Sequence, residues 1–185
     1  MALTAQEMKS KKITEILAMI DSRLENKQAK DIKIFVQKMY KRLPAEEVLS
    51  IKAERLYGSA LSVYKFAANR EAETAKVRVF SPTLEEHGWK TSHTVIEIVN
   101  DDMPFLVDSV TAALSQRGLN VHLVIHPVLH VERDKKGAHV KFHDSAEKNA
   151  QKGIAESFMH LEIDEQSDPA VLAEIERELF YVLGD

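Results

Sequence analysis

The residues of this chain best suited to chemistry are its histidines and one cluster of carboxylates. There are eight histidines and no cysteine, which excludes disulfides, thiolate nucleophiles and Cys-ligated zinc. His122, His126 and His130 recur at every fourth residue. In a strand, that spacing separates neighbouring side chains by about 13 Å, whereas ligands must lie about 2 Å from a shared zinc ion. Unless other strands contribute, these histidines predict no metal site.

The carboxylates Asp101 and Asp102 are adjacent, and Asp108 follows within two helical turns. General acid–base catalysis would require a cleft that raises the pKa of one of them. The simpler interpretation is that they stabilise the positive end of a helix, and we favour it. Gly-rich phosphate loops, GxSxG and HExxH are all absent. The sequence therefore predicts no catalytic residue, although an enzyme built on these three aspartates is the opposing hypothesis.

The carboxylates lie within residues 93–131, where the sequence pattern predicts secondary structure most clearly. The predicted order is strand, acidic turn, helix, glycine and strand. Pro104 is predicted at the first helical position, and Gly118 ends the helix. The turn Asn100–Pro104 thus lies where a strand ends and a helix begins. Backbone N–H groups there lack partners within the helix, so the turn is suited to a small anionic or zwitterionic ligand.

Apolar residues at helical spacing predict helices through residues 1–70, and Gly58 within them indicates close packing against another backbone. After a polar linker the period becomes alternating. Val121, Leu123 and Ile125 are predicted to share one face of a strand, while residues 144–155 are predicted to form a loop or a frayed helical turn. The turn Asp134–Gly137 predicts a hairpin with Val131 opposite Val140 and Leu129 opposite Phe142.

This order predicts an α+β fold in two parts. Residues 1–70 form a helical segment, and residues 76–185 form a ferredoxin-like antiparallel sheet with two helices on one face. Its final strand is missing or replaced. Either Val77–Phe80 fills the vacant place, or the sheet edge is open to a partner. Because the order stops where that strand is expected, we interpret the chain as a fragment truncated at its C-terminal end.

Composition and charge limit the binding partners and the cellular locations that can be expected for this chain. The net charge of −4 argues against nucleic acid or an anionic membrane as a partner of the whole molecule. No apolar run reaches membrane-spanning length, and the first twelve residues lack the apolar core of a signal peptide. A cytoplasmic protein is the simplest prediction.

Two short motifs carry a resemblance to a known family. The segments DMPFLV (102–107) and GLNV (118–121) resemble the signature of ACT domains, which are small amino-acid-sensing regulatory modules. More specifically, NDDMPFLVDSV, HPVLHVERD and ESFMHLEID are similar to the N-terminal ACT-like region of the large bacterial NAD-specific glutamate dehydrogenases. The resemblance runs from about Leu56 to the final predicted helix.

The resemblance implies a non-catalytic N-terminal regulatory or oligomerisation region. The parent enzyme would oxidatively deaminate L-glutamate to 2-oxoglutarate with NAD, and its catalytic and NAD-binding parts would lie downstream, so no cofactor is expected in this chain. Implied partners are a second copy or the parent's downstream domains. The alternative is a stand-alone amino-acid-sensing ACT module.

Carried onto this sequence, the family pattern implies contacts to a small amino-acid effector. They would come from the strand–helix turn and from the residue before the second strand. One departure matters, because the pattern's glycine after proline is Phe105 here. Its side chain would either fill the space of the ligand or pack inward. The implied effector-binding residues are Asn100, Asp101, Asp102, Met103, Phe105 and Asn120.

Overall fold

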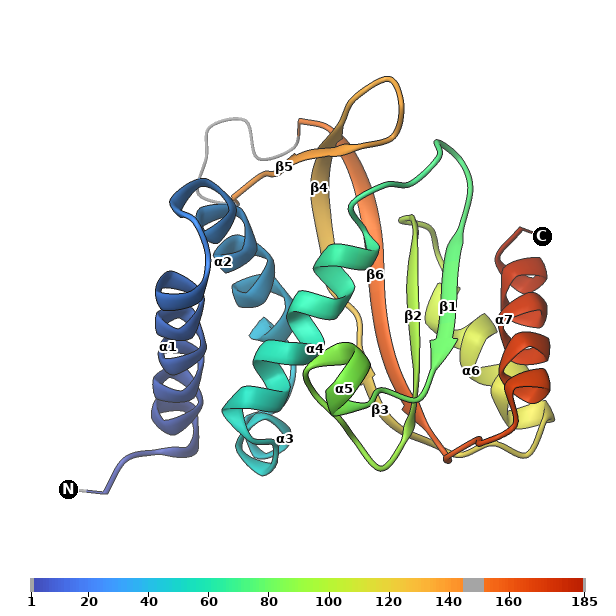
Figure 1. Ribbon diagram of the computed structural model, residues 1–185, viewed down its shortest axis with the longest axis horizontal. Coiled ribbons are helices and arrows are strands. Elements are labelled where there is room, and N and C mark those ends of the chain that lie inside the picture. The colour runs from blue at the N-terminus through green and yellow to red at the C-terminus, as the bar shows by residue number, and fades with distance from the viewer. Residues whose placement is uncertain (1, 145–151, 185) are drawn as a thin grey trace.

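The structure is a computed structural model that describes residues 2–144 and 152–184, so most of the loop predicted at 144–155 lies outside the described residues. Its six strands form one antiparallel sheet with helices on both faces (Figure 1). The sheet order is β1-β2-β6-β4-β5, and β3 also pairs with β6. The strands are β1 (Lys76–Phe80), β2 (Thr94–Asp101), β3 (Val121–Ile125), β4 (Val128–Arg133), β5 (His139–Phe142) and β6 (Ile154–Ile163). The helices are α1 (Ala5–Arg23), α2 (Asn26–Lys41), α3 (Ala45–Ser50), α4 (Ala53–Phe66), α5 (Leu84–His87), α6 (Leu106–Gln116) and α7 (Pro169–Gly184).

One face of the sheet is covered by helices α1–α4, which the sequence predicted as a helical segment (Figure 1). Their apolar stripes and the sheet residues beneath them form a single core. Phe35 on α2 lies at its centre, with ring-centroid distances of 5.3 Å to Phe142 and 5.4 Å to Phe158. None of the helices within the described ranges is both long and apolar enough to cross a membrane.

The opposite face is covered by α6 and α7, as the sequence predicted (Figure 1). Their apolar residues pack on Ile96 and Met159 in a second core. Helix α7 begins as its sequence indicates, with Pro169 at the first position and the backbone N–H of Ala170 donating to Asp168 Oδ1 at 2.9 Å. The predicted α+β architecture is therefore confirmed.

The vacant place in the sheet is filled by β1. Of the two alternatives that the sequence left open, the one in which Val77–Phe80 fills this place is therefore correct. Strand β1 pairs antiparallel with β2, with Val77 opposite Ile98. Its free edge is partly covered, because the Val79 N–H donates to Glu176 Oε2 on α7 at 3.1 Å. Covering an edge amide in this way hinders pairing with another chain.

The predicted alternation along β3 was wrong for one residue. A bulge lies between Val121 and Leu123, so that Val121 packs with α6 and α7 while Leu123 and Ile125 pack with the helical segment. A bulge inserts one residue on one strand only, which reverses the face of everything before it. Beyond the bulge, β3 and β4 keep one continuous register along β6.

The predicted hairpin turn is confirmed, with Gly137 in the left-handed region at a φ of 83°. Its predicted register is wrong, because Val131 lies opposite Phe142 and not Val140. A bulge between Glu132 and Arg133 adjusts the pairing near the turn. The shift is by two residues, so each side chain keeps the face that alternation predicted.

Gly58 is closely packed, but the neighbour is a side chain and not the backbone that the sequence predicted. A Cβ at Gly58 would lie 2.6 Å from Cβ and Cγ of Trp89. Trp89 is buried beside α4, with its ring 6.0 Å from that of His160 on β6. Glycine is therefore needed here in spite of its helix-weakening effect.

Candidate functional site

The predicted site begins at the turn between β2 and α6. The sequence predicted Pro104 as the first helical residue, and this prediction is wrong. Helix α6 begins at Leu106, and the residue before it, Phe105, has a φ of 66°. A left-handed residue cannot continue into the helix, so Phe105 becomes the N-cap, and its side chain makes no capping hydrogen bond. The position where the ACT pattern has glycine is thus a position that favours glycine.

The paired carboxylates do not cap this helix, contrary to our interpretation of the sequence. Asp101 forms an ion pair with Arg70, which lies between α4 and β1. Asp102 Oδ1 accepts a hydrogen bond from Ser157 Oγ at 2.6 Å, and its backbone N–H donates to the carbonyl of Ala155 at 2.8 Å. The two carboxylates fasten the turn to β6 and to the helical segment.

A buried ion cluster underlies the turn, and sequence reasoning missed it. Glu156 is fully buried on β6, and its Oε1 lies 2.9 Å from Arg70 Nη2 and 2.7 Å from Arg133 Nε. Burial alone raises the pKa of Glu156, but the hydrogen bonds and charges of the two guanidinium groups outweigh it and lower that pKa. The available signal was a charged residue within a strand that is apolar on both faces.

Two large apolar side chains flank the turn on the surface. Met103 is 49% exposed and Phe105 is 74% exposed, so Phe105 does not pack inward. Asn100 is buried, and its Nδ2 donates to Met103 Sδ at 3.9 Å. The first-turn N–H groups of α6 face the same turn. We call residues 100–105 with this first helical turn the turn site; chemically, it can accept a carboxylate at its N–H groups and an apolar group against Met103.

The structure does not bring Asn120 to the turn site. Asn120 precedes β3 at the opposite end of the sheet, where its N and Nδ2 both donate to Asp164 Oδ2 at 2.9 Å. Since β2 and β6 pair along eight residues between the two ends, the separation is about 23 Å. One small ligand cannot contact both groups within one chain.

A second buried carboxylate, Glu162, lies near the Asn120 end of the sheet. Thr91 Oγ1 donates to its Oε1 at 2.8 Å, and His160 Nε2 lies 3.4 Å from its Oε2. Burial alone raises the pKa of Glu162, but the interactions with His160, Thr91 and the Arg55 charge outweigh it and lower that pKa from 4.5 to about 2.

Glu162 should make the stability of the fold sensitive to acid. Its folded pKa lies below its ordinary value, so its contribution is complete above pH 4.5 and is lost as the pH falls toward 2. We expect Glu162→Gln to be less stable at neutral pH and to lose less stability between pH 5 and pH 2. Melting temperatures across this range, with exposed Glu165→Gln as the control, measure the effect; parallel curves for Glu162→Gln and the parent sequence would refute it.

Phe105→Gly should stabilise the chain, although it removes a large side chain. A left-handed conformation costs a non-glycine residue about 1–2 kcal/mol, while glycine costs about 0.5–1 kcal/mol in backbone entropy. Because Phe105 is mostly exposed, little burial is lost. We expect the free energy of unfolding to rise by up to about 1 kcal/mol in urea titrations. Met103→Gly, without a positive φ, should lower it; a loss of stability in Phe105→Gly would contradict the strain.

The described residues do not fit a metal or a nicotinamide cofactor. Among residues 2–144 and 152–184, no group of three or more His, Asp or Glu side chains could hold an ion. The six glycines stand at 58, 88, 118, 137, 153 and 184, so no GxGxxG loop joins a strand to a helix.

The sheet order, the two helices on one face and the strand–turn–helix site define an ACT-like α+β module. The sequence matches the family described as "Glutamate dehydrogenase, ACT1 domain" over residues 35–179, and the chain belongs to this family. It is 39% identical over 166 residues to the NAD-specific glutamate dehydrogenase of Halomonas elongata and 32% identical over 164 residues to that of Pseudomonas aeruginosa. These alignments cover 90% and 88% of the chain but 10% of each relative, so the chain spans about a tenth of their length. No solved structure matches it at a significant level.

Proposed function

We propose that the chain is a non-catalytic N-terminal regulatory and assembly region of an NAD-specific glutamate dehydrogenase in the cytoplasm. Its parent would oxidise L-glutamate to 2-oxoglutarate with NAD, which binds in downstream domains. Two findings support the proposal. The chain belongs to the ACT1 family, and it spans about a tenth of the length of relatives that are named NAD-specific glutamate dehydrogenase.

The contacts of the turn site support a regulatory role. Arg70 joins Asp101 of the turn to Glu156, and its Nη1 donates to the Thr74 carbonyl at 2.9 Å in the connection that leads to β1. A ligand that moved the turn would therefore act directly on the junction between residues 1–70 and 76–185, the two parts into which we divide the chain. Self-association or contact with downstream domains would pass this change to the parent enzyme.

We infer that an amino-acid effector would be shared between two modules. The turn site (Asn100, Asp101, Asp102, Met103 and Phe105) and Asn120 lie at opposite ends of the sheet, so a ligand that uses both needs a second copy or a second module. The exposed pair Met103 and Phe105 beside the first turn of α6 also supports the alternative, a stand-alone amino-acid-sensing module.

The parent enzyme provides the decisive test. Deleting the region that corresponds to this chain should alter oligomeric mass or the response to amino acids, and an unchanged enzyme would overturn the proposal. The 185-residue chain alone should show no NADH formation from glutamate and NAD; turnover would equally overturn it.

Effector binding is tested separately by calorimetry of the chain against the twenty amino acids at millimolar concentration. We expect heat for at least one of them together with a ligand-dependent increase in sedimentation. Heat without association would favour the stand-alone sensor, and no heat with any amino acid would dismiss both.

A further inference from the structure

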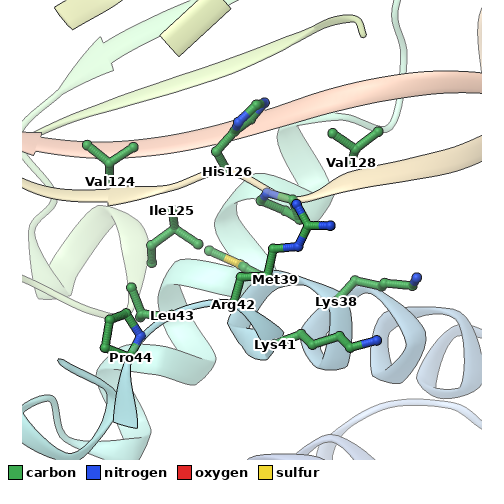
Figure 2. Close-up of a pocket in the computed structure, with 11 residues that line it drawn as sticks. Lys38, Met39, Lys41, Arg42, Leu43, Pro44, Val124, Ile125, His126 and Val128 are labelled. Atoms are coloured by element: carbon green, nitrogen blue, oxygen red, sulfur yellow. The ribbon is translucent and has the colours of Figure 1, made fainter. Parts of the chain in front are cut away.

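One edge of the sheet is open and lies beside a basic helix end. In the described part of the chain, β3 has a partner strand, β6, on one side only. On the other side a groove of about 300 Å³ separates residues 124–128 from the C-terminal end of α2. Figure 2 shows Lys38, Lys41 and Arg42 along this helix end, with the Arg42 side chain extending toward the strand segment at His126.

The backbone of this edge is arranged for another strand. The Phe158 N–H donates to the Pro127 carbonyl, so odd-numbered residues of the segment bond to β6. Residues alternate in an antiparallel ladder, and the N–H and C=O groups of Val124, His126 and Val128 therefore point into the groove. The next even residue, His130, confirms the direction, because its carbonyl accepts from the N–H of His143 beyond β5.

Within the part of the chain that the structure describes, the backbone groups of this window that point into the groove are not covered. Pro127 removes an N–H that would point toward β6, so the groove keeps all of its donors. At the other edge of the sheet, the carboxylate of Glu176 covers the Val79 amide, and we find no such cover over residues 124–128 within the described residues. The window is bounded by the bulge at Val121 and by β5.

The positive charge beside the groove indicates which kind of strand could bind there. Lys38, Lys41 and Arg42 form no ion pair with the residues that the structure describes, and Lys41 and Arg42 are exposed. A second copy paired through the same edge would be related by a two-fold axis, which would bring two such cationic clusters together. An acidic strand would neutralise them.

We propose that the open edge of β3–β4 binds an extended acidic protein segment by strand addition. Its backbone pairs with Val124, His126 and Val128, and carboxylates at alternate positions meet Lys38, Lys41 and Arg42. The positions between them place apolar side chains beside Val124 and the partly exposed Val128. Such a segment is recognised by main-chain hydrogen bonds and by charge, independently of any effector at the turn site.

The probe is a fluorescein-labelled peptide of alternating valine and glutamate, six residues long, titrated with the 185-residue chain by fluorescence anisotropy. We expect binding that weakens with salt, and no binding of the same peptide with lysine in place of glutamate. Methylation of the peptide's groove-facing amides should weaken binding at least tenfold, since it blocks strand pairing without changing charge.

Variants of the chain separate the two contributions. Lys38→Gln with Lys41→Gln should weaken binding at least tenfold, whereas Lys27→Gln with Lys30→Gln, the same pair of changes at the other end of α2, should leave it unchanged. Val128→Pro removes one groove-facing donor and should weaken binding at least fivefold.

Several outcomes would overturn the proposal. They are an absence of binding to the acidic peptide, equal binding of the lysine peptide, and equal loss in the Lys27/Lys30 control. Unchanged affinity for the methylated peptide would show an anion site without strand addition. Sedimentation that reveals a dimer dissolved by Val128→Pro would show that a second copy occupies the edge. The methylated peptide keeps the test decisive if Val128→Pro fails to fold.

Discussion

Glu156→Ala is expected to lower the free energy of unfolding by about 3–5 kcal/mol, measured by urea denaturation at pH 7. Glu156 is fully buried and accepts hydrogen bonds from both Arg70 and Arg133. Without it, two guanidinium groups with side-chain exposures of 1% and 7% would face each other with Asp101 as the remaining carboxylate partner. An unpaired buried charge costs more than the pair contributes, so the loss should exceed that of an ordinary hydrogen bond.

The matched control is Glu165→Ala, which removes an exposed glutamate just beyond the same strand and should change stability by less than about 0.5 kcal/mol. Glu156→Gln keeps the volume and one acceptor and should fall between the two. If Glu156→Ala proves no more harmful than Glu165→Ala, the buried cluster does not hold the turn to the helical segment.

Phe35→Ala should also cost about 3–5 kcal/mol, because it removes a fully buried ring from the core. The ring stacks on Phe142 and meets Phe158 edge to face, so it joins α2 to both β5 and β6. We expect far-UV circular dichroism and the fluorescence of Trp89, the single tryptophan, to report one shared transition in urea.

Phe180→Ala on α7 is the control, since that ring is 44% exposed and lies in the other helical layer. It should cost well under 2 kcal/mol. Two separated transitions in Phe35→Ala, one for the helices and one for Trp89, would show that residues 1–70 fold independently of the sheet.

Much of the fold could be predicted from local sequence signals. Apolar periodicity located the helices, and the motif Asp168–Pro169 placed the start of α7 at the correct residue. Bulges could not be predicted in the same way. The bulge beside Val121 turns the side chain of that residue to the opposite face of the sheet, and the bulge near Arg133 changes the register of the hairpin. Neither bulge alters the pattern of apolar residues in the sequence, so neither can be recognised from it. The sequence indicated a vacant place in the sheet, but local signals could not decide whether β1 or a partner fills it.

The site was predicted less completely, and the reasons are geometric. The turn was located correctly, but its carboxylates were assigned to a helix that begins two residues later than predicted. Their partners, Arg70 and Ser157, lie 31 and 55 residues away in the sequence. Such distant pairing leaves no periodic signal, and effector binding at these residues stays a prediction.

The position of β1 bears on how the chain reaches its native state. In a βαββαβ unit the last strand in the sequence takes the edge position beside the first strand. Here that edge position, beside β2, is taken by β1, which precedes all the other strands, as in a circular permutation. The hairpin of β4 and β5 is local and can close within microseconds, but β2 must find β6 across more than fifty intervening residues. High contact order of this kind slows folding, so the central pair should form late and the two helical layers should consolidate only once it exists.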